Sequence, residues 1–209
     1  MYWTISTSNK PDVLWQANAT GRSNNLCIEF IESTDTAPKV NYQTILIDLA
    51  KWDEYWKQDA CNFVPEVIEH FPKDCCQTES AYQSALAMHR KKIERWQKEV
   101  PKTGRVPAVC FETSLVNHRL KIKQGRHRIA YLRQIKLPVF AAAIPIDCIA
   151  ALHCNQLHYH LSPSPHVGRS LSVMQTCPVT NQTGSFSQRT TKSAKIRPLI
   201  INGDSHETS

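Results

Sequence analysis

The clearest alternation of apolar and polar positions lies just before residue 125. Leu120 and Ile122 alternate with three cationic residues over residues 119–123, which is the period of a strand with one buried face. Gly125 follows closely, and glycine readily adopts the backbone angles that a tight turn requires. The pattern therefore predicts a strand that ends in a glycine turn.

After this turn the apolar positions change to a helical period. Ile129, Leu132 and Ile135 share one face of a predicted helix, and the arginines between them are free to face elsewhere. Residues 139–144 form a continuous apolar run, which is typical of a buried strand. The segment 119–145 is therefore predicted to form a strand, a glycine turn, a helix and a second strand.

The rest of the chain supplies further elements of both kinds. Strands are predicted over residues 13–17, 26–31, 42–49 and 105–113, the first two as a hairpin. Helices are predicted over residues 63–71, 79–100 and 146–157. Pro101 is expected to stop the longest helix, because proline cannot donate a backbone hydrogen bond. The predicted fold class is mixed α/β, a small mixed β-sheet flanked by helices, in one domain over residues 1–160 that begins with a β-hairpin extension.

Composition changes after residue 161. Ser, Thr, Gln and Pro dominate through Ser193, and few large apolar side chains are present to build a core. Residues 161–209 are therefore predicted to be a mostly disordered tail. Its apolar segment, residues 196–201, is a candidate for docking as an extra strand or for binding a partner.

Charge is strongly one-sided around the glycine turn. No Asp or Glu occurs from Thr113 through Ile146, whereas seven Lys and Arg lie between Arg119 and Lys136. The whole chain carries a net charge of +7, which favours a polyanionic partner.

A helix that starts at a glycine turn can bind anions. Its first N–H groups are unpaired, the helix dipole is positive there, and arginine adds forked donors that suit phosphate. We therefore expect a phosphate site beside Gly125. The alternative is that Arg126 and Arg128 are solvated residues at the start of a helix and that the glycine only makes a turn.

The segment Gly125–Ala130, GRHRIA, carries a family resemblance. It resembles the G-x-x-R box of the ParB/sulfiredoxin superfamily, in which a helix start holds nucleotide phosphates. Gly125, His127 and Arg128 match the sulfiredoxin form, but Arg126 stands where its reactive cysteine would be, so sulfinic-acid reduction is not expected. Partition proteins have glutamate at that position, which argues against their CTP-dependent clamp. The GRHR form looks most like the plasmid fertility-inhibition branch, of the oncogenic-suppression type.

The resemblance implies a nucleotide-hydrolysing DNA nuclease that blocks conjugative DNA transfer. The cofactor would be ATP or another nucleotide, with Mg²⁺ as a candidate metal. The residues that would hold the nucleotide are Gln124, Gly125, Arg126 and Arg128. The catalytic residues would be Glu112, Arg126, His127 and Arg128, with Glu112 orienting a metal or a water. Arg119, Lys121, Lys123 and Arg133 are the candidate DNA contacts.

Two other functions stay open. A non-catalytic module could bind DNA or nucleotide through the same box and inhibit by docking on the conjugative or type IV transfer machinery. A partition or regulatory DNA-binding protein is the third hypothesis, although no helix-turn-helix signature is evident. No Walker loop and no G-x-G-x-x-G turn occur, so any nucleotide hydrolysis would depend on the box at Gly125.

Several other residues have both a structural and a functional interpretation. Trp52 and Trp56 could stack bases, but core packing is the stronger interpretation, because aromatic side chains bury large areas. His89 lies on the apolar stripe of residues 79–100 and is expected to be a hydrogen-bonded core residue. The basic residues of that helix are interpreted as a solvated face, with DNA-backbone contact as the alternative. Histidines and a cysteine gather at residues 153–166, but their spacing does not indicate a zinc site.

The eight cysteines are expected to be reduced. No apolar leader follows Met1, and no apolar run approaches the ~20 residues of a membrane span. The chain is therefore expected in the bacterial cytoplasm, where thiols stay reduced, and a disulfide framework is not expected.

Overall fold

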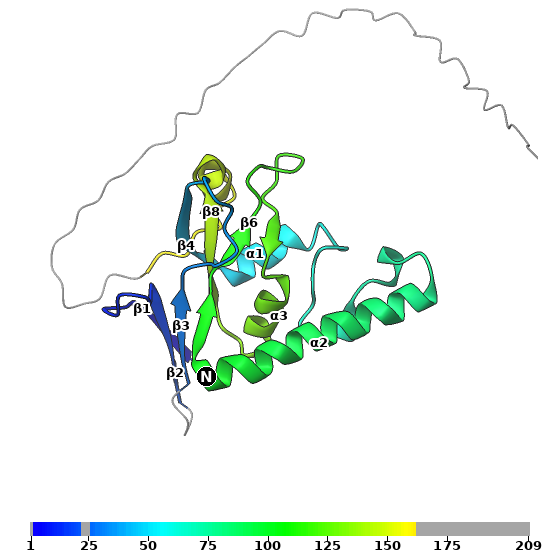
Figure 1. Ribbon diagram of the computed structural model, residues 1–209, viewed down its shortest axis with the longest axis horizontal. Helices are drawn as coiled ribbons and strands as arrows, with labels where there is room; N and C mark the ends of the chain where they lie inside the picture. The colour runs from blue at the N-terminus through cyan, green and yellow to red at the C-terminus, as the bar shows by residue number, and fades with distance from the viewer. Residues whose placement is uncertain (1, 22–25, 162–209) are drawn as a thin grey trace, which may run out of the picture. The chain divides into compact units, whose positions relative to one another are not determined.

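The computed structural model describes residues 2–21 and 26–161, which belong to one compact unit spanning Met1–Ser164. Within these residues the fold is mixed α/β, as the sequence predicts, but its strands form two four-stranded mixed sheets instead of one (Figure 1). The tail predicted over residues 161–209, including its apolar segment 196–201, lies outside the described residues except for its first position.

The first sheet has the strand order β1-β2-β3-β5. Its strands are β1 (Tyr2–Thr7), β2 (Trp15–Thr20), β3 (Cys27–Ile31) and β5 (Arg105–Pro107). The pairing of β2 with β3 is antiparallel, with Trp15 opposite Phe30, which confirms the predicted hairpin. The sequence did not predict β1, whose inward residues Trp3 and Ile5 are only half-buried. The parallel partner of β3 is β5, which arrives from the far end of a long helix.

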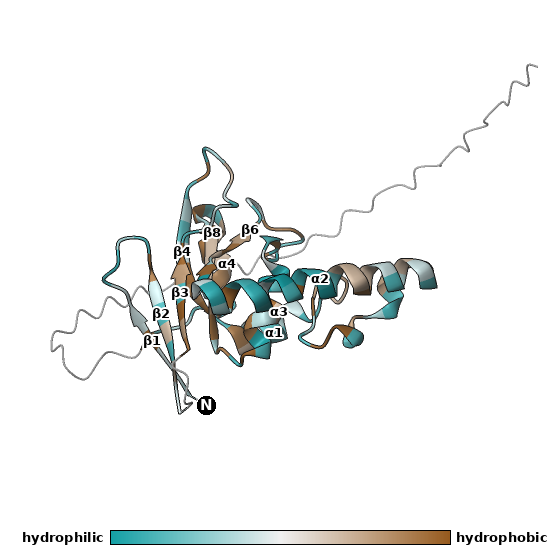
Figure 2. Cartoon of the chain, turned by 60° about the horizontal axis from the view of Figure 1, so that its bottom comes forward, coloured by the Kyte–Doolittle hydropathy of each residue, from teal (hydrophilic) through white to brown (hydrophobic). Residues whose placement is uncertain are grey.

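The second sheet has the order β4-β8-β6-β7. Its strands are β4 (Tyr42–Asp48), β8 (Val139–Pro145), β6 (Val109–Phe111) and β7 (Ile122–Gln124). All seven residues of β8 are buried, which confirms the predicted buried strand. It runs antiparallel to β4 and parallel to β6, and in Figure 2 it lies in the hydrophobic interior.

The strand predicted over residues 105–113 is divided between the two sheets. Arg105 belongs to β5 in the first sheet, and Val109 belongs to β6 in the second. Ala108 separates them, fully buried, and its N–H donates to the carbonyl of Ile31 at 2.8 Å. A continuous apolar run cannot reveal this change of partner, because Val106 of β5 and all three residues of β6 are buried alike.

Four α-helices accompany the sheets in the described part of the chain: α1 (Leu49–Trp56), α2 (Glu79–Thr103), α3 (Arg126–Gln134) and α4 (Ile149–Cys154). The apolar stripe of α2 is confirmed, since Leu86, His89, Ile93 and Val100 are all buried. The prediction that Pro101 stops this helix is wrong. The helix ends at Gly104, which adopts φ 66° and donates to the carbonyl of Val100. Proline removes only one donor so close to the end, whereas glycine easily takes the left-handed conformation that terminates a helix.

The connection between α1 and α2 is irregular. The helix predicted over residues 63–71 is wrong, because that range contains only the short turn η1 (Ile68–His70), and a second turn, η2 (Lys73–Cys75), follows it. Cys61 and Cys75 form a disulfide with Cα atoms 5.2 Å apart. The expectation of reduced cysteines is therefore wrong for this pair, which sequence spacing alone could not identify.

The tryptophans of α1 lie in the core. Trp52 is fully buried, and its ring meets those of Phe111 and Phe140 edge to face. Trp56 is 3% exposed. Their structural interpretation is confirmed, and base stacking by these two side chains is excluded by burial. Among the described helices none is both long enough and apolar enough to cross a membrane.

Candidate anion-binding site

The turn between β7 and α3 requires glycine. Gly125 has φ 113° and ψ 5°, and a Cβ placed there would lie 3.0 Å from both methyl carbons of Val109. The first backbone bond of α3 runs from the N–H of Ile129 to the carbonyl of Gly125. Within the described residues, the N–H groups of the three residues between them have no hydrogen-bond acceptor. These N–H groups are the usual anion-binding feature of a helix start.

A cavity of about 520 Å³, here called the α2–α3 hollow, lies beside this turn. It is lined by residues from both helices, from the β3–β4 connection and from β5. Four cationic side chains line it, namely Lys92, Arg95, Arg105 and Arg128. Asp35 and Glu99 are its two carboxylates. The hollow therefore has an excess of positive charge.

Arg128 forms the buried wall of the hollow. It is 6% exposed, and its Nη1 donates to the carbonyls of Pro107 and Ala108, each at 2.7 Å. Its Nη2 lies 3.6 Å from a carboxylate oxygen of Asp35, and its guanidinium stacks 4.8 Å from the ring centre of Trp96. Its buried Nε has no hydrogen-bond partner within the described parts of the chain. Burial lowers the pKa of Arg128 and nearby Asp35 opposes this, so the group stays cationic with one unmet donor.

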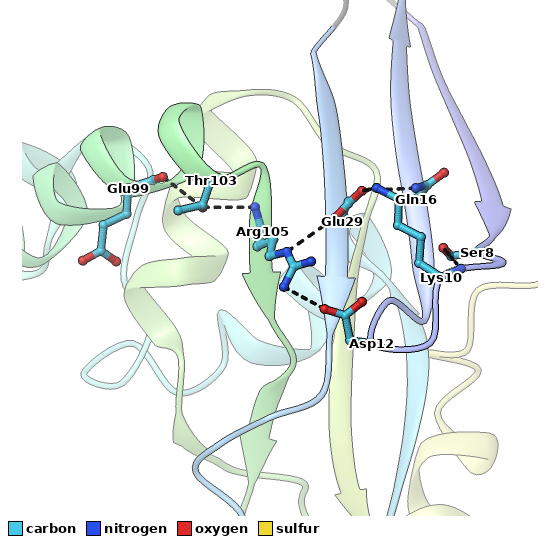
Figure 3. A network of polar contacts seen from close by, with 8 residues as sticks. All are labelled: Ser8, Lys10, Asp12, Gln16, Glu29, Glu99, Thr103 and Arg105. Carbon is cyan, nitrogen blue, oxygen red and sulfur yellow. Dashed lines mark hydrogen bonds and ion pairs between the residues drawn. The ribbon is translucent and has the colours of Figure 1, made fainter.

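The other cations of the hollow differ in how far they are neutralised. Arg105 lies between Asp12 and Glu29, at 2.8 and 3.6 Å (Figure 3). Arg95 pairs with Glu99 one helical turn further on, at 2.7 Å. Lys92 has no carboxylate partner among residues 2–21 and 26–161. Its charge is therefore available to a ligand.

Two histidines meet where α2 crosses α3. Nδ1 of His89 lies 2.7 Å from Nε2 of His127, and His127 lines the hollow. Burial, with a smaller contribution from the cations Arg126 and Lys92, lowers the pKa of His89 to about 4. Burial, followed by His89 and the same two cations, lowers the pKa of His127 to about 3. Both rings are therefore neutral at pH 7, so one donates a hydrogen bond to the other. The interpretation of His89 as a hydrogen-bonded core residue is confirmed.

The structure brings together only part of the predicted site. Gln124, Gly125, His127 and Arg128 line the hollow. Arg126 does not, because its Nη1 donates to the side chain of Asn62 at 2.8 Å. Glu112 does not line the hollow either. It follows β6, where its N–H donates to the carbonyl of Lys121. The predicted catalytic residues Glu112, Arg126, His127 and Arg128 are therefore not assembled in one place.

The predicted DNA contacts are also dispersed. Arg119 and Lys121 line a second cavity of about 320 Å³, where Arg119 donates to the carbonyl of Tyr55. Lys123 is exposed, and its Nζ donates to the carbonyl of Asp35 at 3.3 Å. These three side chains remain on the surface or in an open cavity.

Arg133 is buried, unlike the other candidate DNA contacts. Its Nε and Nη2 donate to the carboxylate of Asp53 at 2.7 and 2.6 Å, and its Nη1 donates to the carbonyl of Val64. Arg133 is 8% exposed and stacks on the ring of Phe63. The prediction that the arginines of this helix face away from the core is therefore wrong for Arg128 and Arg133. Arg133 is satisfied inside the fold and is not presented to a nucleic acid.

Sequence reasoning did not assign the contribution of α2 to the site. Lys92, Trp96, Glu99 and Thr103 all line the hollow. They recur at steps of four, three and four, which places them on one helix face. This spacing was the available signal, but a basic helix face is ordinarily solvated.

The histidine cluster near the end of the described chain lies elsewhere. His158 forms a bridge with Ile47 of β4, at the edge of the second sheet opposite to β7 and Gly125. Within the described residues no group of three His, Cys, Asp or Glu side chains is arranged to hold a metal ion. His166 lies outside those residues.

The fold and the hollow together define an α/β protein with a cationic cavity at a helix start. Comparisons with known proteins add no family to this description. No protein-family model matches the chain, and no curated protein or solved structure is significantly similar to it.

Proposed function

We propose that the protein binds a nucleoside polyphosphate, such as ATP, in the α2–α3 hollow. The observation that carries this proposal is the set of backbone N–H groups in the first turn of α3, which have no acceptor within the described residues and adjoin the hollow that Gly125, His127 and Arg128 line. Phosphate oxygens accept hydrogen bonds from such N–H groups, and the guanidinium of Arg128 in the same wall adds positive charge. The excess of cations favours an anionic ligand of more than one charge, since it includes Lys92, which has no carboxylate partner in the described part of the chain.

We further propose that the bound nucleotide is used to cleave DNA and thereby to block conjugative transfer, in the cytoplasm of a plasmid-bearing bacterium. This part rests on the resemblance of Gly125–Ala130 to the fertility-inhibition branch of the ParB/sulfiredoxin superfamily, together with the net charge of +7. In the hollow, Asp35 and Glu99 replace Glu112 as the carboxylates that could bind Mg²⁺ or orient a water. Arg119, Lys121 and Lys123 remain the candidate DNA contacts.

A second candidate function is binding without catalysis. It is favoured by the positions of Glu112 and Arg126, which lie outside the hollow and leave it without the predicted catalytic set. In this case the nucleotide-bound or DNA-bound protein would inhibit by docking on a component of the transfer machinery.

Two measurements on purified protein separate these functions. The first is calorimetric titration with ATP, for which we expect saturable binding that Arg128→Ala weakens. The second is incubation with ATP and plasmid DNA, with and without Mg²⁺, for which the nuclease proposal expects ATP turnover and DNA cleavage. ATP binding without either reaction would favour the binding module. A folded wild-type protein that binds no ATP would contradict nucleotide binding in the hollow and would leave only the DNA-bound form of the second function.

A further inference from the structure

A disulfide closes the connection between α1 and α2. It joins Cys61 to Cys75, and the enclosed segment, residues 61–75, is here called the stapled loop. Cys61 is exposed, Cys75 is half-buried, and the next residue, Cys76, is a free cysteine. The bond is therefore accessible to a thiolate from solution, which is how disulfides exchange.

The first part of the stapled loop is bound to α3. Asn62, directly after Cys61, accepts a hydrogen bond from Arg126 at 2.8 Å. The carbonyl of Val64 accepts one from Arg133 at 2.7 Å. Arg126 and Arg133 lie near the two ends of α3, so the loop holds the whole length of this short helix.

The last part of the stapled loop packs on α2 beside the histidine pair. The ring centre of Phe71 lies 4.7 Å from that of His89, and the carbonyl of Phe71 accepts from the hydroxyl of Tyr82. His89 bonds to His127, which lines the α2–α3 hollow. Two contact paths, one through Asn62 and one through Phe71, therefore connect the stapled loop to the first turn of α3.

The packing of the loop allows it to loosen separately from the main core. Val64, Ile68 and Phe71 belong to a small buried cluster with residues of α2 and α3, distinct from the large cluster around β8. Segments with their own small contact network can open locally while the rest of the fold persists.

We propose that the Cys61–Cys75 disulfide is a redox modification site that controls the order of the first turn of α3 and thereby the ligand affinity of the hollow. The effect on affinity rests on the function proposed above for the hollow. The reductant is a dithiol. Its first thiolate attacks Sγ of Cys61, the S–S bond breaks, and Cys75 leaves as a thiolate that takes up a proton. The second thiol of the reductant then displaces Cys61, which gives a second protein thiol and the oxidised dithiol.

Reduction frees the backbone of the stapled loop, whose conformational entropy rises once the cross-link is lost. Asn62 and Phe71 are then held less firmly against Arg126 and His89. The N–H groups at the start of α3 become less ordered, and a ligand must spend binding energy on ordering them. Ligand affinity is therefore higher in the oxidised form.

Hydrogen exchange of the full chain, read by mass spectrometry with and without dithiothreitol, tests this coupling. On reduction we expect peptides covering residues 61–75 and 129–132 to exchange about tenfold faster, while β8 is unchanged, because the N–H groups of residues 129–132 are bonded to the first turn of α3. Cys61→Ser should show the fast pattern without reductant, and Cys76→Ser, a free cysteine beside the bond, should behave like the wild type. Asn62→Ala, which keeps the disulfide, should speed exchange at residues 129–132 in the oxidised form.

Titration with ATP in both redox forms is the second arm, and we expect the dissociation constant to rise about tenfold on reduction. Equal ATP affinity in both forms would overturn the proposal. So would unchanged exchange at residues 129–132, or equally faster exchange throughout β8. If ATP binds neither form while exchange at residues 129–132 still responds, the redox site stands and the proposed ligand of the hollow is wrong.

Discussion

Helix α3 carries a buried arginine in each half, and their surroundings differ. All three nitrogen positions of Arg133 are used, two by the carboxylate of Asp53 and one by the carbonyl of Val64. Arg128 binds two carbonyls and lies 3.6 Å from Asp35, but its Nε is unmet within the described chain and a cationic hollow opens beside it. A buried arginine therefore does not define a ligand site by itself. A ligand site also needs accessible donors and uncompensated charge, which the first turn of α3 and Lys92 supply beside Arg128 within the described chain.

The largest expected effect of a substitution on stability is at the buried pair of Arg133 and Asp53. Asp53→Ala leaves Arg133 buried without its carboxylate and should lower the free energy of unfolding by about 3 kcal/mol, as for other broken buried pairs. Asp12→Ala removes an exposed partner of Arg105 and should cost less than about 1 kcal/mol. Urea denaturation measures both. Equal costs for the two variants would show that Arg133 is not structural.

The pair of His89 and His127 beside the α2–α3 hollow predicts that the stability of the protein depends on pH. Both folded pKa values lie well below the ordinary value of 6.5, so below that pH the unfolded chain takes up protons that the folded protein does not. The stability of the neutral pair is complete above pH 6.5 and is lost as pH falls towards 4. From pH 7 to pH 5 we expect a loss of about 2 kcal/mol for each histidine.

The variant His89→Phe isolates this contribution, since the carboxylates of the protein titrate in both proteins. Its free energy of unfolding should fall less steeply between pH 7 and pH 5 than that of the wild type. Identical slopes in urea denaturation at a series of pH values would mean that the pair is not held neutral.

The turn that opens the hollow should tolerate no side chain. Gly125→Ala combines φ 113° with contacts of 3.0 Å to Val109, and should cost about 1–3 kcal/mol. Gly104→Ala is the comparison, because its φ of 66° lies inside the region that other residues can enter and its added Cβ would meet one atom, the carbonyl oxygen of Cys27 at 3.3 Å. It should cost about 1 kcal/mol. A smaller cost at Gly125 than at Gly104, measured by denaturant unfolding, would contradict this account of the turn.

Arg95→Ala is expected to have the smallest effect on stability. It is also expected to weaken ligand binding selectively. Its side chain is largely exposed, so Arg95→Ala should change the free energy of unfolding by less than about 0.5 kcal/mol. The same variant should weaken ATP binding about tenfold by removing a cation from the hollow. Arg90→Ala is the control, because Arg90 lies on α2 and pairs with Glu69 outside the hollow. Equal ATP affinities for both variants would place the ligand elsewhere.

The sequence predicted the elements that have a strong local pattern. These include β8 with its continuous apolar run, the glycine turn and the apolar stripe of α2. It failed where the outcome depends on partners distant in the chain. Arg133 looks solvated by periodicity, and only the fold brings Asp53 to it.

In the candidate site, too, the residues of one local segment were predicted, and those that depend on distant partners were not. Gln124, Gly125, His127 and Arg128 were predicted from one short segment and do line the hollow. Arg126 belongs to that segment too, but Asn62 binds it away from the hollow, and Asn62 is placed by a connection with no helical pattern and an unforeseen disulfide. The sequence did not predict that Lys92, Arg95 and Arg105 line the hollow, because cations on a helix face or strand end are ordinarily solvated.

The most direct test of the central claim is nitrogen NMR of the full chain during titration with inorganic pyrophosphate. The account predicts saturable shifts of the backbone N–H signals of Arg126, His127 and Arg128, and of the Nε–H signal of Arg128, with the Nε–H signal of Arg133 unchanged. Shifts that avoid the first turn of α3, or that move the Arg133 signal as much as that of Arg128, would contradict it.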